Sequence, residues 1–139
     1  MIVAFVEPDE YEQKAWIVEK LQDVITQLVI KEGAIVFMFT NAGNFDGDCY
    51  TIVSRLKKYY PYIERLYFHG GCDYDVGYVN WMSEFYDNLH FPEKGVVISS
   101  HMRDCAMIDM CTVVVTCGSA PSVEYARQKK KRVINIYKK

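Results

Sequence analysis

Residues Ile98–Glu124 read ISSHMRDCAMIDMCTVVVTCGSAPSVE, which is the end of one apolar run, a helical stretch and a second apolar run, Thr112–Thr116. A cation, Arg103, follows the first run, and a carboxylate, Glu124, follows the second. If both runs are parallel strands, the turns after them open on the same edge of a sheet. The sequence therefore predicts that Arg103 and Glu124 converge on one ligand.

Outward from this stretch, short apolar runs alternate with segments whose apolar residues recur at the spacing of one helix face. The predicted strands are Ile2–Val6, Ala34–Phe39, Ile63–Phe68, Gly95–Ile98, Thr112–Thr116 and Arg132–Tyr137. The predicted helices run from Asp9 or Glu10 to Lys31, and over Phe45–Tyr59, Val79–Leu89, Met102–Met110 and Pro121–Lys130. This alternation favours an α/β fold, with one doubly wound three-layer domain over residues 1–139 and a mostly parallel sheet of about six strands.

The composition indicates a folded domain of ordinary size. The chain has 139 residues, of which 50% are hydrophobic, and a net charge of −2. Apart from Lys129–Arg132 it has no basic block, so a basic face for nucleic acid or an anionic membrane is not expected. Its apolar runs are far shorter than the roughly 20 residues that span a bilayer. We therefore expect a soluble protein with no nucleic-acid or membrane partner.

The cysteines indicate a reducing compartment. There are five of them, and no pair has Cys-x-x-Cys spacing. Most lie inside apolar patterns, as reduced core thiols do. The first residues, Met1–Glu7, carry no basic leader. We therefore expect a cytoplasmic location.

The turn after the second predicted strand is the first candidate binding segment. Its small residues Thr40, Asn41 and Gly43 let backbone N–H groups approach a ligand, but it has neither the Gly-x-Gly-x-x-Gly nor the Walker pattern. Asp46 and Asp48 follow, and a carboxylate about 5 Å from a phosphate opposes it by roughly 3 kcal/mol at an effective dielectric near 20. We therefore assign this turn to sugar hydroxyls, or to a divalent metal that bridges a phosphate. The alternative is that both acids merely favour the helix start.

The turn Gly118–Ser122 is the second candidate. It carries no acid before Glu124, so its N–H groups and the hydroxyls of Ser119 and Ser122 can face an anion unopposed. Ser99 lies at the end of the preceding predicted strand and is a further candidate contact. The turn is therefore the better predicted phosphate site, although such residues also suit turns that bind nothing.

Arg103 has two interpretations. A guanidinium at a helix start is disfavoured by the helix dipole, so an anionic ligand or a nearby carboxylate should compensate it. The alternative is a surface arginine held by Asp104 or Asp109. The loop His69–Asp75 has metal-compatible side chains without zinc spacing, and no nucleophile elbow is present. We therefore expect no resident metal and no covalent catalysis.

Four stretches in a fixed order resemble one known family. They are TNAGNFD at Thr40–Asp46, LKKYYPYI at Leu56–Ile63, RDCAMID at Arg103–Asp109 and SVEYARQK at Ser122–Lys129. In this order they resemble the small YpsA-like members of the SLOG superfamily, a Rossmann-like group that also contains the cytokinin-activating LOG phosphoribohydrolases. The resemblance spans about Ile35–Ile136. It implies a Rossmann-like domain that binds a nucleotide or nucleotide derivative.

The LOG enzymes add an implied catalytic pair. In them an arginine of a Met-His-x-Arg-Lys element and a glutamate of Pro-Gly-Gly-x-Gly-Thr-x-Glu act on the N-glycosidic bond of a nucleoside monophosphate. Arg103 and Glu124 match that pair by position, and Ser122 stands where the threonine does. Asp104 replaces the lysine, and Cys117–Pro121 replaces the Gly-Gly loop. The resemblance therefore implies a ligand class more than a reaction.

Three functional hypotheses follow. The first is a cytosolic sensor or sequestering protein for a nucleotide, with the base stacked on Tyr74, Tyr78 or Trp81. The second is an N-glycosidic hydrolase in which Glu124 stabilises the ribosyl centre or activates water and Arg103 orients the phosphate or Glu124. The third is a non-catalytic interaction protein with a vestigial cleft and a tyrosine-rich surface. Because LOG-like relatives are commonly dimers, a homodimer or higher homo-oligomer is also expected.

Overall fold

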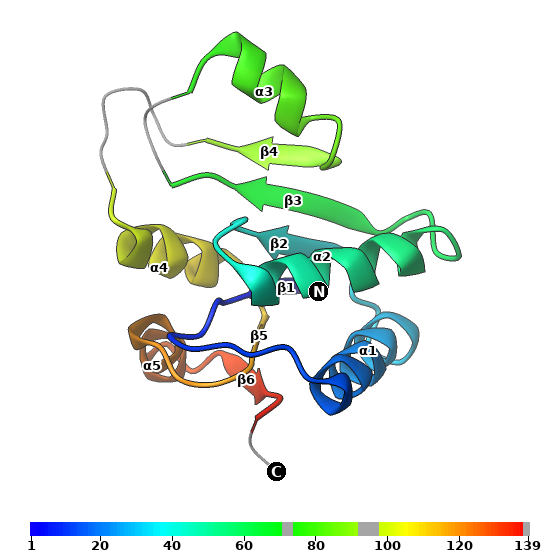
Figure 1. Ribbon diagram of the computed structural model, residues 1–139. Coiled ribbons are helices and arrows are strands. Elements are labelled where there is room, and N and C mark those ends of the chain that lie inside the picture. The colour runs from blue at the N-terminus through cyan, green and yellow to red at the C-terminus, as the bar shows by residue number, and fades with distance from the viewer. Residues whose placement is uncertain (71–73, 92–97, 138–139) are drawn as a thin grey trace.

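The computed structural model describes residues 1–70, 74–91 and 98–137 (Figure 1). Its strands are β1 (Ile2–Phe5), β2 (Val36–Phe39), β3 (Glu64–Phe68), β4 (Asn88–His90), β5 (Val113–Thr116) and β6 (Arg132–Asn135). Its helices are α1 (Ala15–Ile30), α2 (Asn44–Lys57), α3 (Val76–Met82), α4 (Ser100–Met110) and α5 (Pro121–Gln128).

The described strands form one parallel sheet in the order β4-β3-β2-β1-β5-β6. Val3 of β1 lies opposite both Phe37 of β2 and Val113 of β5. The chain adds β2, β3 and β4 on one side of β1 and then β5 and β6 on the other. This confirms the predicted α/β architecture, and it places the reversal of strand order between β1 and β5. Ligands of such sheets lie at the carboxyl ends of the strands beside this reversal.

Helices cover both faces of the sheet (Figure 1). Successive strand residues point to opposite faces. Val3 and Phe5 therefore join one buried cluster with Leu21 of α1, while Ala4 joins another with Met107 of α4. The two clusters hold α1 and α2 on one face and α4 and α5 on the other. In the described part of the chain, no helix combines the length and hydrophobicity of a membrane span.

One strand lies where a helix was predicted. The predicted helix Val79–Leu89 is wrong at its end, because α3 stops at Met82 and Leu89 belongs to β4. Leu89 is half-buried between two exposed residues of a three-residue edge strand, so no apolar run marks it. Most of the predicted strand Gly95–Ile98 lies outside the described residues, and Ile98 itself is not in a strand. The other strands and helices differ from their predicted bounds by one or two residues at an end, α1 excepted.

The chain between β1 and α1 is longer than predicted. α1 begins at Ala15 and not at Asp9 or Glu10. The Asp9 N–H donates to the Ser119 carbonyl at 2.9 Å, and the Tyr11 hydroxyl donates to Asp48 at 2.5 Å. This segment therefore connects the turn after β5 with the first turns of α2, along the carboxyl edge of the sheet.

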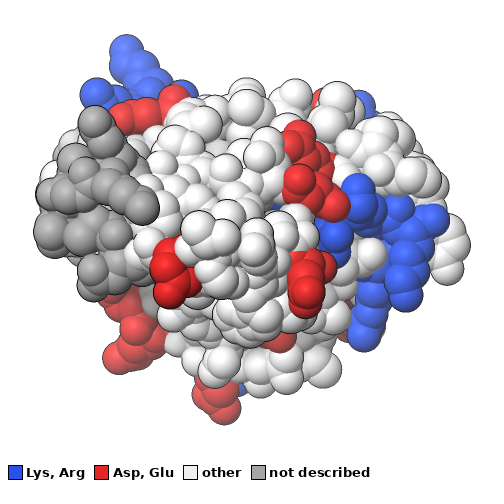
Figure 2. Space-filling model, turned by 90° about the horizontal axis from the view of Figure 1, so that it is seen from above, with Lys and Arg blue, Asp and Glu red and all other residues white. Residues whose placement is uncertain are grey.

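The end of the molecule around α3 carries few charges. Figure 2 looks onto this end and shows a central surface that is mostly uncharged, with Lys and Arg at its right-hand side and upper left and separate Asp and Glu side chains between and below them. Val76, Trp81 and Phe85 are among the exposed large apolar side chains. Met82, on the other side of α3, is buried against the core.

Candidate functional site

Several connections meet at the carboxyl edge of the sheet. Glu7, after β1, accepts a hydrogen bond from the start of α2. Gly70, after β3, lies against the side chain of Arg103. Asp104 of α4 accepts a hydrogen bond from Ser122 of α5. The fold therefore brings most of the predicted binding segments into one region.

The turn between β2 and α2 is closed by its own carboxylate. Asp46 is only 2% exposed. Its Oδ2 accepts from the Thr40 N–H at 2.9 Å and its Oδ1 from the Asn41 N–H at 3.1 Å. Asn41 has a φ of 55°, a left-handed conformation that asparagine tolerates. Two N–H groups that were predicted to face a ligand are therefore satisfied within the protein.

A second carboxylate, that of Glu7, lies on the first turn of α2. Its Oε2 accepts from the Phe45 N–H at 3.3 Å and its Oε1 from the Asp46 N–H at 3.0 Å. A Cβ at Gly43 would lie 2.8 Å from the Glu7 carboxyl carbon, so the glycine permits this approach. The first N–H groups of a helix are the ones that bind an anion. Glu7 therefore occupies the position that a bound anion would take.

Burial raises the pKa of both of these acids. Burial raises the pKa of the Asp46 carboxyl to about 7, against the hydrogen bonds from Thr40 and Asn41, and the charge of Glu7 raises it further. Burial also raises the pKa of Glu7, and the charges of Asp48 and Asp104 add to that rise. The start of α2 is therefore a poor environment for further negative charge.

Arg103 connects two of these turns. Its side chain is 14% exposed, and its Nη2 lies 3.0 Å from Asp104 Oδ1. A Cβ at Gly70 would lie 2.5 Å from Arg103 Cδ, so only glycine fits after β3 with the arginine in this position. The charge of Arg103 lowers the pKa of His69 and opposes the rise at Asp46. The guanidinium is therefore within electrostatic reach of both turns.

The turn between β5 and α5 is built differently. Gly118 has a φ of +135°, which favours glycine, and its N–H and C=O both bond to the Asn135 side chain, at 3.0 and 2.8 Å. Ala120 precedes α5 and provides no side-chain cap. The buried hydroxyl of Ser122 donates to Asp104 Oδ2 at 3.1 Å, and Ser119 is exposed. Within the described residues, no carboxylate accepts from the first N–H groups of α5.

The contacts of Glu124 do not involve Arg103. Its side chain is 72% exposed, and it pairs with Arg127 one turn further along α5 at 3.6 Å. Arg103 pairs with Asp104, one of the two partners foreseen for a surface arginine. The convergence of Arg103 and Glu124 on one ligand stays a prediction.

Ser99 has a local role at the start of α4. Its hydroxyl accepts from the Met102 N–H at 3.1 Å, which caps the helix. The ring of His101, two residues on, lies 3.5 Å from both the Ser122 hydroxyl and the Cys105 sulfur. These contacts hold α4 against α5 near Asp104.

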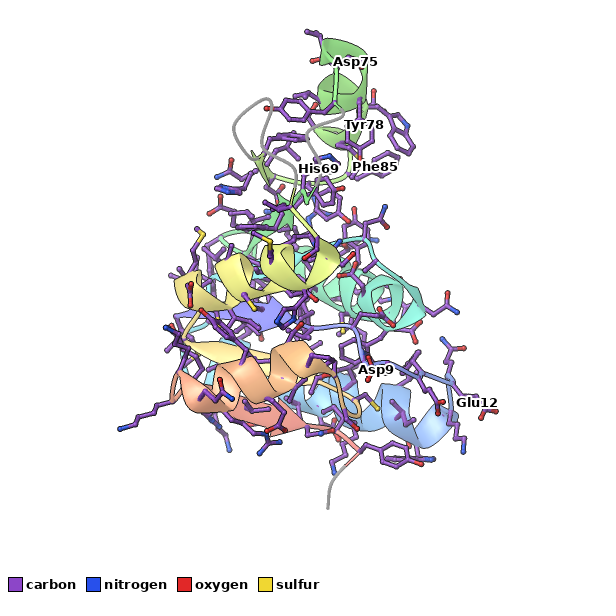
Figure 3. All side chains as sticks on the ribbon, turned by 90° about the vertical axis from the view of Figure 1, so that its left-hand side faces the viewer. Asp9, Glu12, His69, Asp75, Tyr78 and Phe85 are labelled. Atoms are coloured by element: carbon purple, nitrogen blue, oxygen red, sulfur yellow. The ribbon has the colours of Figure 1, made fainter. Side chains whose placement is uncertain are left out.

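An aromatic cluster, defined by Tyr67, His69, Tyr74, Tyr78 and Phe91, lies near α3 (Figure 3). The Tyr67 hydroxyl lies 2.8 Å from His69 Nδ1 and 2.9 Å from the Tyr78 hydroxyl. Burial and the charge of Arg103 both lower the pKa of His69. Among the described residues, its buried Nε2 has no hydrogen-bond partner.

A separate cavity of about 580 Å³ lies beside the segment between β1 and α1. It is lined by Asp9, Glu10, Tyr11, Glu12, Lys14, Ile17, Cys117, Gly118, Ser119 and Tyr137. Figure 3 shows Asp9 and Glu12 at the opposite end of the view from His69 and Tyr78. Two predicted contacts, Gly118 and Ser119, therefore line this cavity, while the other predicted contacts do not.

The described residues contain no group of three or more His, Cys, Asp or Glu side chains that could hold a metal ion. The comparisons with known proteins support the fold and indicate no function. No family model and no curated protein matches this chain. One similar solved structure is the X-ray structure of TM1055, a structural genomics target, with 12% identity, a TM-score of 0.61 and coverage of 95% of this chain and 71% of that one. It supports the Rossmann-like fold.

Sequence reasoning missed Glu7 as a site residue and gave Asp104 no role at the α5 turn. The segment Glu7-Pro8 was predicted to lie at the carboxyl end of the first strand, but Glu7 was given no binding role, and its bonds to α2 span 38 and 39 residues. The available signal was an acid directly after a buried strand, because that position lies at the carboxyl edge of a parallel sheet. Asp104 could be found only as the neighbour of Arg103.

Proposed function

We propose that this protein binds a nucleotide or nucleotide derivative that contains a ribose phosphate, as a cytosolic sensor or sequestering protein. The observation that carries the proposal is the position of Arg103. It lies against Gly70, the residue after His69 of the aromatic cluster, and it pairs with Asp104, which accepts from Ser122 at the α5 turn. A cation, an aromatic wall and hydroxyl acceptors are the groups that recognise phosphate, base and ribose.

The aromatic cluster supports the base end of the ligand. Tyr78 is half-buried and bonds through its hydroxyl to Tyr67, so its ring is held in place. The side chain of Trp81 is 54% exposed, and its ring centroid lies 6.2 Å from that of Tyr78. Base stacking on such rings contributes about 1–3 kcal/mol per base.

The uncapped start of α5 supports the phosphate end. Pro121 has no N–H, and the N–H groups of Val123 and Glu124 donate to the Ala120 carbonyl at 3.0 and 3.4 Å. In the described part of the chain the Ser122 N–H carries no acid, and Arg103 reaches this turn through Asp104 and the Ser122 hydroxyl. Backbone N–H groups at a helix start favour anions. We therefore propose that the phosphate binds at the start of α5 and not at the start of α2.

Isothermal titration calorimetry against nucleosides and their mono- and diphosphates tests the proposal. We expect at least one member to bind with a stoichiometry of one per chain, and Arg103→Ala to weaken it at least about tenfold, as loss of a charged hydrogen bond does. Arg127→Ala is the matched control, because Arg127 is exposed and pairs with Glu124. The absence of heat with every member would contradict the proposal.

A second candidate, hydrolysis of an N-glycosidic bond, is favoured by two observations. The side chain of Glu124, which the resemblance matches to a catalytic glutamate, is 72% exposed and so open to a substrate. Burial raises the pKa of the Asp46 carboxyl to about 7, a range that suits an acid or base at neutral pH. Chromatographic detection of free base from nucleoside monophosphates tests it. Loss of release in Asp46→Asn but not in Glu124→Ala would assign the chemistry to the α2 turn, and the reverse result would assign it to Glu124. No release with wild type would exclude hydrolysis of these substrates and leave the binding proposal intact.

The expected homodimer or higher oligomer is part of the proposal. Static light scattering on the purified chain tests it, and a monomer mass at micromolar concentration would contradict it.

A further inference from the structure

The cavity beside the segment between β1 and α1 lies at the reversal of strand order. Its lining includes Asp9 after β1, Gly118 after β5, Tyr137 after β6 and Ile17 of α1. Ligands of doubly wound sheets lie at the carboxyl ends of the strands beside this reversal. The volume of about 580 Å³ falls in the range of cavities that hold small molecules. The described lining includes neither Arg103 nor the aromatic cluster, so this cavity is separate from the groups that carry the proposed function.

The wall of the cavity after β1 is held at both of its ends. The Asp9 N–H donates to the Ser119 carbonyl at 2.9 Å, which fixes the wall on the turn after β5. The Tyr11 hydroxyl and the Gln13 side-chain amide both donate to the Asp48 carboxylate, which fixes it on α2. A wall that is already held in place lowers the cost of ordering the site when a ligand binds.

The charged groups of the lining are mostly acidic. They are the carboxylates of Asp9, Glu10 and Glu12 against one ammonium group, that of Lys14 (Figure 3). In the described part of the chain, none of these four groups forms an ion pair. Three carboxylates around one cavity favour a cation there and oppose a phosphate.

The rest of the lining is largely apolar or aromatic, and this observation is independent of the acids. Ile17 and Cys117 are only 2% and 3% exposed, and both line the cavity. Tyr11 and Tyr137 add two aromatic rings. A bare metal ion gains nothing from such a surface, whereas the apolar body of an organic cation is buried by it. The faces of aromatic rings also attract ammonium groups.

We propose that this cavity is a second binding site, which takes an organic amine. The protonated amino group lies among the three carboxylates, and the apolar body of the ligand packs against Ile17, Cys117 and the tyrosine rings. The inference goes beyond the proposed function, because it concerns another cavity and a ligand of the opposite charge. The protein would therefore bind an anionic and a cationic small molecule at separate places on one edge of the sheet.

Saturation-transfer NMR titrations with matched ligands test the inference. 2-Phenylethylamine, 2-phenylethanol and 3-phenylpropanoate share a ring and a short chain and differ in charge. Hexylamine, hexanol and hexanoate form the same series without the ring. We expect at least one amine to bind at least about tenfold more tightly than its alcohol, because it gains charge-assisted hydrogen bonds. The carboxylate of that series should bind more weakly than the alcohol.

Two double variants locate the bound amine. Asp9→Asn with Glu12→Gln removes two of the three negative charges of the lining, and the ratio of amine to alcohol affinity should fall to a few-fold. Glu19→Gln with Asp23→Asn is the matched control, because it changes the net charge equally at two exposed acids of α1 outside the lining. The control should keep the wild-type ratio.

Several results would overturn the inference. They are no binding of either amine, equal binding of each amine and its alcohol, or tighter binding of the carboxylates. A loss of the ratio in the control that equals the loss in the cavity variant would also overturn it, because the amine would then respond to net charge alone. The comparison of ligands uses the wild-type protein, so it decides the question even if a variant fails to fold. The nucleotide titrations are a separate experiment, so either proposal can fail alone.

Discussion

The turns before α2 and α5 are alike in sequence and different in structure. Each follows a parallel strand, contains small residues and opens a helix at the carboxyl edge. At α2, Glu7 and Asp46 accept from the N–H groups of the turn. At α5 the described contacts leave the first N–H groups without a side-chain cap. Small residues alone therefore do not identify a phosphate site, because a distant carboxylate can fill it.

The largest expected effect on stability is at the turn between β2 and α2, where Asp46 accepts from the backbone. Asp46→Ala leaves two N–H groups, those of Thr40 and Asn41, without acceptors. We expect the free energy of unfolding to fall by about 3 kcal/mol, since each unpaired buried donor costs about 1–3 kcal/mol. Urea unfolding at pH 5.5 measures it, with Asp23→Ala, at an exposed position on α1, as the control. Equal losses in the two variants would mean that Asp46 does not hold the turn.

The pH dependence of stability also tests whether Asp46 is buried in the turn before α2. The pKa of Asp46 is raised from 3.8 to about 7 on folding, so the folded state binds its proton more tightly. Its contribution to stability is present below the unfolded pKa and is lost as pH rises through the folded pKa. Between about pH 4 and 7, Asp46→Asn should therefore remove a downward slope of at most about 1.4 kcal/mol per pH unit. Thermal unfolding across this range measures the slope, and an unchanged slope relative to wild type would refute the assignment.

Two glycines in the same turn should respond in opposite directions. In Gly43→Ala the new methyl group would lie 2.8 Å from the Glu7 carboxyl carbon and push it off α2, at a cost of about 1–2 kcal/mol. In Gly47→Ala the methyl group meets nothing within 4 Å, and the helix should gain up to about 1 kcal/mol. Urea midpoints compare the pair. A stabilised Gly43→Ala would show that Glu7 does not sit on the helix start.

The smallest effect is expected at the α5 turn. Ser122→Ala removes the hydrogen bond to Asp104, which also pairs with Arg103, and the longer 3.5 Å contact with the His101 ring. A loss of about 0.5–1.5 kcal/mol in unfolding free energy is expected. Ser119→Ala, at an exposed position, is the control. A loss as large as that of Asp46→Ala would remove the contrast between the two turns.

The fold could be predicted from the sequence because its signals are local. Apolar runs and helical spacing along the chain indicated the α/β sheet, and most helices and strands were placed to within a few residues. β4 was missed because an exposed three-residue edge strand has no apolar pattern to detect.

The candidate site was harder to predict from the sequence than the fold, because its contacts join residues that are far apart in the chain. Glu7 reaches α2 across 38 residues, and Asp104 reaches Ser122 across 18. No periodicity encodes such pairs. Arg103 pairs with Asp104 beside the α5 turn, whereas Glu124 lies on α5 with its side chain exposed and paired with Arg127. Asp46 and Asp48 already disfavour a phosphate at the start of α2, and Glu7 brings a third acid to the same turn.

Native mass spectrometry of the purified chain with the nucleoside and nucleotide series tests the central claim most directly. The account predicts a one-to-one adduct with at least one ribosyl compound, retained in Arg127→Ala and lost in Arg103→Ala. Spectra that show only the mass of the unliganded protein across the whole series would contradict it.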